Sequence, residues 1–151
     1  MATPLPPRPA PIREFETYIY KEVDGRPLYA DVYPPTTSNE SHPTAIYISG
    51  GGWSSNNRTD YPRPLFHQLR AQGYVICSLG YRSVPETLLP VILTDFKDFG
   101  VWVRTRLPEK LRDQGIKVDG SKLVVIGFSA GGHYALLTVY YVPLKYINRT
   151  C

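Results

Sequence analysis

The sequence predicts an α/β domain in which an N-terminal hairpin is followed by a mostly parallel sheet with flanking helices. Two observations carry this prediction. After residue 33, short apolar strand-like runs alternate with helical patterns, and this alternation is typical of parallel βαβ units. In addition, a Gly-x-Ser-x-Gly segment at 127–131 joins the last strand-like run to the last helical one, as a sharp strand–turn–helix junction requires.

The first half of the chain predicts the hairpin, a third strand and a helix. Residues 15–23 alternate large and polar side chains, and a second strand-like run follows the Asp-Gly turn at 28–33. An Asp-Gly pair between two such runs favours a hairpin. The apolar run 45–48 is typical of a buried strand. Apolar residues at helical spacing over 63–72 predict a helix that ends at Gly73.

The second half predicts two more strands and two more helices. Residues 74–79 are strand-like, and a longer helix begins at Pro90. Pro108 is expected to end that helix, because proline cannot donate a main-chain hydrogen bond inside one. Residues 123–126 are expected to form the fifth strand, and residues 131–142 the last helix.

One compact domain is expected over residues 15–142. Residues 1–14 hold a cluster of prolines and predict a flexible tail. Residues 143–151 are expected to form an irregular C-terminal tail. The 151 residues are enough for a single core.

Composition excludes several classes of function. The net charge is +4, but 17 basic residues are scattered among 13 acidic ones, so no nucleic-acid partner is expected. No apolar stretch approaches the roughly 20 residues needed to span a membrane. Cys77 lies in an apolar run and Cys151 is the last residue, which favours a reducing, cytoplasmic location without disulfides. No metal cluster or phosphate-binding loop is visible, so neither metal nor cofactor is expected.

Two glycine-rich turns hold the candidate chemistry. The Gly-x-Ser-x-Gly segment predicts Ser129 as a nucleophile on a strained turn, with the motif glycines Gly127 and Gly131 leaving room for neighbouring backbone. The run that begins at Gly50 follows the third strand. A backbone without side chains at this point can direct its N–H groups at a developing oxyanion.

These segments resemble the esterases and lipases related to hormone-sensitive lipase and arylacetamide deacetylase, within the α/β-hydrolase superfamily. The resemblance rests on residues 48–53, 80–86, 90–102 and 127–133. It implies that Ser129 is the nucleophile and that the oxyanion hole is made by the N–H groups of Gly51, Gly52 and Ala130. The family's glycine loop usually begins with histidine, and Ser49 stands there instead.

The resemblance also implies a fold truncated after the nucleophile helix. In this superfamily an acid and then a histidine follow the serine along the chain, and only 22 residues follow Ser129. His133 lies one helical turn further on and is expected to be an ordinary helix residue. His42 and His67 are expected at the surface, and Asp95 and Asp98 are explained as acids near a helix start.

Three functions remain open from the sequence. The first is a serine hydrolase of the carboxylesterase or lipase type, acting on an ester of a small organic molecule such as a secondary metabolite. The second is a catalytically inactive remnant or an incomplete gene model. The third is a non-catalytic protein that binds a small ligand. Self-association is expected through the exposed edge of the strand at 123–126.

Overall fold

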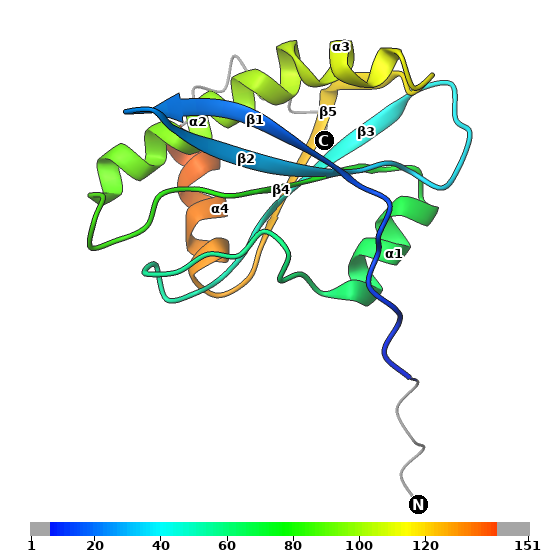
Figure 1. The fold of residues 1–151 in the computed structure, drawn as a ribbon. Coiled ribbons are helices and arrows are strands. Elements are labelled where there is room, and N and C mark those ends of the chain that lie inside the picture. The colour runs from blue at the N-terminus through cyan, green and yellow to red at the C-terminus, as the bar shows by residue number, and fades with distance from the viewer. Residues whose placement is uncertain (1–6, 142–151) are drawn as a thin grey trace, which may run out of the picture.

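The computed structural model describes the main chain of residues 7–141 and the side chains of residues 7–138 (Figure 1). A five-stranded sheet has the strand order β1-β2-β4-β3-β5. The elements are β1 (Glu16–Val23), β2 (Arg26–Tyr33), β3 (His42–Ile48), α1 (Arg63–Ala71), β4 (Val75–Leu79), α2 (Leu89–Thr105), α3 (Leu107–Arg112), β5 (Val118–Gly127) and α4 (Ala130–Tyr141).

The sheet is antiparallel on the hairpin side and parallel from β4 onward. β1 pairs with β2, and β2 with β4, in antiparallel register. β3 lies between β4 and β5 and is parallel to both. The predicted fold class is confirmed, including the hairpin. The parallel part matters for function, because β3 and β5 end side by side, with Ile48 opposite Gly127.

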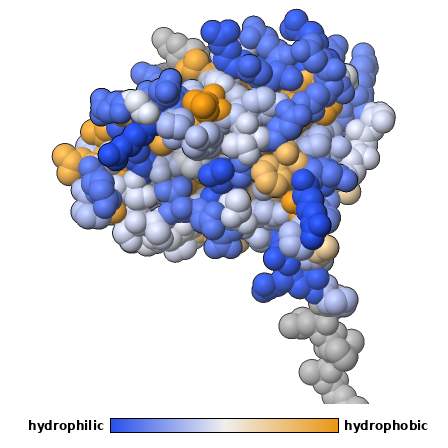
Figure 2. Space-filling view, viewed as in Figure 1, coloured by the Kyte–Doolittle hydropathy of each residue, from blue (hydrophilic) through white to orange (hydrophobic). Residues whose placement is uncertain are grey.

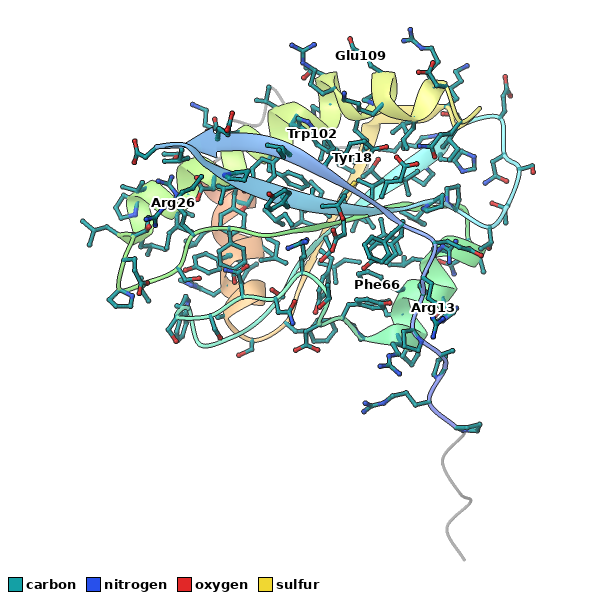
Figure 3. The ribbon with its side chains drawn as sticks, viewed as in Figure 1. Arg13, Tyr18, Arg26, Phe66, Trp102 and Glu109 are labelled. Carbon is teal, nitrogen blue, oxygen red and sulfur yellow. The ribbon has the colours of Figure 1, made fainter. Side chains whose placement is uncertain are left out.

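Helices cover both faces of the sheet (Figure 1). On one face, α1 contributes Phe66 to a core with the tyrosines of β2 and β3. On the other, α2, α3 and α4 pack over the larger core. Figure 3 shows Tyr18 of β1 beside Trp102 of α2, and their ring centroids lie 5.9 Å apart. Cys77 of β4 is fully buried, and burial raises the pKa of its thiol.

One local prediction is incomplete and one is wrong. α2 ends at Thr105, close to Pro108 as predicted, but Pro108 itself lies in the first turn of the short helix α3, which was not predicted; a missing N–H costs nothing at that position. His42 is buried at the start of β3, and its Nδ1 lies 2.8 Å from the main-chain oxygen of Gly73. The carbonyl that satisfies the ring belongs to the turn before β4, a partner that sequence does not reveal.

The N-terminal segment contacts the domain over the part that the structure describes. Ile12 is buried, and its N–H donates to the hydroxyl of Tyr61 at 3.0 Å. Glu14 pairs with Arg70 of α1. The domain boundaries remain a prediction, but residues 7–14 are not free of the domain surface. The expected tail at 143–151 lies outside the described residues.

β5 is an edge of the sheet formed by the described residues. It pairs with β3 on one side only. A cavity of about 220 Å³ beside it is lined by core side chains that include Leu123 and Phe99. On the face seen in Figure 2, hydrophobic groups are small and separated by hydrophilic ones. Over the described residues, no helix has the length and apolar character needed to cross a membrane.

Candidate active site

Ser129 lies in the sharp turn between β5 and α4. Its φ is 54°, in the left-handed region that side chains rarely adopt. A Cβ at Gly127 would lie 2.1 Å from the Gly131 oxygen, and a Cβ at Gly131 would lie 2.2 Å from the Ile48 oxygen. Both glycines are therefore required by the approach of neighbouring backbone. The turn holds Ser129 at the start of α4, where the helix dipole is positive.

The glycine loop, residues 49–58 after β3, directly faces this serine turn. Gly51 and Gly52 have φ values of 136° and 59°. A Cβ at Gly50 would lie 2.9 Å from the Phe128 oxygen and 3.3 Å from the Ser129 Cβ. The two turns meet because β3 and β5 are adjacent parallel strands, whose carboxyl ends lie at one edge of the sheet.

The structure brings most of the predicted site residues together. Gly50, Gly51 and Ser129 line one cavity of about 690 Å³. Gly52 follows within the same loop, and Ala130, which is buried, is the first residue of α4. The candidate donors thus come from two separate elements, the loop after β3 and the first turn of α4.

Ser49 anchors the glycine loop although it replaces the family's usual histidine. It is buried, and its hydroxyl accepts a hydrogen bond from the Asn57 N–H at 3.2 Å. Its carbonyl accepts one from the Tyr81 hydroxyl at 3.0 Å. Burial raises the pKa of Tyr81 to about 12, so its hydroxyl remains a donor at neutral pH. A short hydroxyl side chain is therefore enough to tie together the two ends of the loop.

The C-terminal end of the glycine loop, at residues 56–58, is held by a buried carboxylate. Asp31 of β2 is fully buried and lies 2.9 Å from the Nε of Arg58. The Ser78 hydroxyl donates to the Arg58 carbonyl at 2.7 Å. Asn56 donates to the Tyr81 carbonyl at 2.6 Å. The loop is thus tied to β2, to β4 and to the segment after β4.

Asp95 is a buried anchor and not an ordinary helix-start acid, so that explanation is wrong. Arg82 binds both of its oxygens, at 2.9 and 2.6 Å, and Lys21 of β1 lies 2.8 Å away. Burial acts to raise the pKa of Asp95, but the hydrogen bonds and charges of Arg82 and Lys21 outweigh it and hold the pKa below its usual range. The network fixes Arg82, and with it the segment that joins β4 to α2.

All three histidines of the chain have other partners. His133 accepts a hydrogen bond at Nδ1 from the Trp53 indole at 3.1 Å. His67 lies 2.9 Å from the Ala10 carbonyl, and His42 is held in the sheet. Within the described residues, no group of three or more His, Cys, Asp or Glu side chains could hold a metal ion.

Aromatic, polar and charged side chains of both signs line the cavity in front of Ser129. Its walls include Tyr47, Tyr61 and Phe128, and Arg63 lies at one side. The Tyr61 ring stacks on Phe66 at 4.2 Å, so this wall is supported from α1. The cavity is large enough for a small organic molecule.

Comparison with known proteins places this arrangement in a family. The family model BD-FAE matches residues 30–151, which include both glycine turns. The chain belongs to the BD-FAE family. The BD-FAE match covers all of the described site, from the strand before the glycine loop to the helix after Ser129.

The relatives of this BD-FAE chain include proteins named as non-reducing polyketide synthases. It is 40% identical over 129 residues to the non-reducing polyketide synthase pkbA of Emericella nidulans, and 41% identical over 129 residues to the non-reducing polyketide synthase atr1 of Stereocaulon alpinum. Each match covers 83% of this chain but only 5% of the synthase. The chain thus corresponds to a small part of each of these relatives.

Solved structures support an esterase fold for the BD-FAE chain. The butyrate-bound thermophilic esterase of Thermogutta terrifontis matches with a TM-score of 0.67 and 28% identity, over 82% of this chain and 43% of that one. The same esterase phosphorylated by paraoxon matches with a TM-score of 0.67 and 26% identity, over 87% and 49% of the two chains. The fold is therefore that of an α/β-hydrolase, and the chain spans less than half of the esterase.

Proposed function

We propose that this chain carries the nucleophile and the oxyanion hole of a serine hydrolase that acts on carboxylic esters. One observation supports this most strongly. Ser129 lies in a left-handed turn at the start of α4, and the Gly50 Cβ position faces it at 3.3 Å from the Ser129 Cβ. A strained serine opposite a loop of bare backbone suits attack on a carbonyl better than binding alone.

The proposed chemistry is acyl transfer. The Ser129 Oγ attacks the ester carbonyl carbon and loses its proton to a base, and the carbonyl oxygen becomes an oxyanion. The N–H groups of Gly51, Gly52 and Ala130 stabilise that charge. The intermediate then expels the alcohol, which takes a proton, and leaves an acyl group on Ser129. Water releases the acid in a second, similar step.

The proposed substrate is the ester of a small secondary metabolite of the polyketide type. The cavity walls of Tyr47, Tyr61 and Phe128 support a flat, unsaturated acyl group. The relatives named as polyketide synthases support the same class of molecule.

Labelling with paraoxon tests the nucleophile without requiring turnover. We expect slow phosphorylation of Ser129, found by peptide mapping, at a rate at least about tenfold above that of an unactivated serine. Ser121 is the internal control, because it is exposed and its hydroxyl donates to Asp119. Ser129→Ala should remove the adduct. Equal labelling of Ser121 and Ser129 would instead favour the non-catalytic ligand-binding alternative.

Turnover of a nitrophenyl butyrate by the 151-residue chain should be small. The three histidines have other partners, so we expect no more than the roughly 10³–10⁴-fold acceleration that survives when a triad is broken. The measurement is the steady rate of nitrophenol release against the buffer rate. A rate well above that ceiling would show that a residue of this chain acts as an efficient base.

A further inference from the structure

His133 contacts the glycine loop through a specific hydrogen bond. Its Nδ1 accepts the indole N–H of Trp53 at 3.1 Å, and the two rings meet at 80° with centroids 5.8 Å apart. An indole nitrogen can only donate, so Nδ1 is the acceptor in this hydrogen bond. The contact therefore depends on the ring nitrogen that faces the loop and not on the size of the ring alone.

Trp53 adopts a backbone conformation that needs support. Its φ is 64°, which is unfavourable for a bulky residue. Burial does not supply the support, because Trp53 is 44% exposed. Its carbonyl accepts the Val84 N–H at 3.0 Å, and its indole donates to His133. These two hydrogen bonds hold the main chain directly after Gly52.

The Trp53–His133 bond joins the two elements that supply the oxyanion donors. Gly51 and Gly52 lie in the loop, and Ala130 lies in the first turn of α4, three residues before His133. Over residues 7–138, this is the one side-chain hydrogen bond that runs between the glycine loop and α4. An oxyanion hole works only if its donors keep a fixed separation.

We propose that His133 is a positioning residue that holds the glycine loop, through Trp53, at the donor geometry of the oxyanion hole. This inference rests on the proposed function of Ser129. It predicts that the acceptor atom matters and not the size of the side chain. Asn places an oxygen near the position of Nδ1, whereas Leu fills similar space without an acceptor.

The test is paraoxon labelling of Ser129 in the full chain and its variants. His133→Leu and Trp53→Phe should each lower the labelling rate about tenfold, less than loss of an oxyanion donor would. The double variant should be no slower than either single one, because both remove the same bond. His133→Asn should restore most of the rate. His67→Leu is the matched control and should leave the rate unchanged.

Acrylamide quenching of tryptophan fluorescence tests the Trp53–His133 hydrogen bond without depending on the reactivity of Ser129. Trp53 is exposed, whereas only 7% of the surface of Trp102 is exposed. Added quencher therefore acts mainly on Trp53, and the Trp53→Phe variant measures the remaining signal from Trp102. His133→Leu should steepen the quenching slope, and His133→Asn should not.

The outcomes separate the two proposals. The positioning role alone would be overturned if Ser129 were labelled equally fast in the parent chain and in His133→Leu. Additive losses in the double variant, or a failure of His133→Asn to restore the rate, would overturn it as well. Label that never reaches Ser129 would overturn the proposed function, and this inference with it.

Discussion

Replacing Asp95 with asparagine should lower the free energy of unfolding by about 3 kcal/mol. Breaking a buried ion pair by removing one partner costs roughly 3–5 kcal/mol. We expect the lower end, because the side chains of Lys21 and Arg82 are 17% and 23% exposed and keep some hydration. Asp95→Asn preserves shape but leaves two cations facing a neutral amide. The measurement is urea unfolding followed by circular dichroism.

Asp98→Asn is the matched control for this prediction. Asp98 pairs with the same Lys21 at 2.6 Å, but its side chain is 48% exposed. Exposed ion pairs contribute only about 0–1 kcal/mol to stability. The free energy of unfolding of Asp98→Asn should therefore differ from that of the parent chain by no more than this. Equal destabilisation by the two variants would contradict the anchoring role of Asp95.

The same carboxylate should make stability depend on pH. Because the pKa of Asp95 is lower in the folded chain than its usual value, its contribution is fully present above the unfolded pKa of about 3.9. It is lost as pH falls through the folded pKa. The difference in melting temperature between the parent chain and Asp95→Asn should therefore become smaller below about pH 4. Thermal unfolding at a series of pH values measures this difference.

The 151-residue chain should self-associate through the edge of β5. Among the described residues, β5 has no strand on its outer side. Unpaired N–H and C=O groups at such an edge are a template for another strand, and the apolar cavity beside it would be covered at the same time. Light scattering after size exclusion should show a dimer or larger species at micromolar concentration. A monodisperse monomer would contradict this.

A charged edge should reverse the self-association. Val124 lies on β5 and is 37% exposed, so Val124→Lys places a charge where an incoming strand would pair. Val101→Lys is the control, because Val101 is 48% exposed but lies on α2 and not on a strand. We expect a shift toward monomer in the first variant only. The same shift in both would indicate a general effect of charge on solubility.

Local signals made most of the fold predictable from sequence. The hairpin needs only an Asp-Gly turn between strand patterns, and Gly127 and Gly131 are required by backbone contacts within a few residues or one adjacent strand. The sequence does not predict the short helix α3, because Pro108 indicates the end of one helix as readily as the first turn of the next.

Residues with distant partners could not be understood in this way. Asp95 meets Lys21 across 74 positions of the chain, and Trp53 meets His133 across 80. Each looks ordinary in its own segment, as a helix-start acid or a helix histidine. Their roles depend on which strands become neighbours, and no periodicity in the sequence encodes that order.

The pairing of β3 with β5 has a consequence for how the proposed site could fail. Ile48 and Gly127 are partners in this ladder, and each is followed at once by one of the two facing turns. A slip of a single residue would move one turn by roughly 3.3 Å relative to the other and turn every side chain of the strand to the opposite face. A misregistered chain would keep its helices, its sheet and Ser129. Its oxyanion-hole N–H groups, however, would be displaced by one residue along the strand and would miss the carbonyl oxygen of the substrate. For this domain, far-ultraviolet circular dichroism could therefore report a folded protein that is inert, and chemical labelling of Ser129 would be the more faithful measure of correct folding.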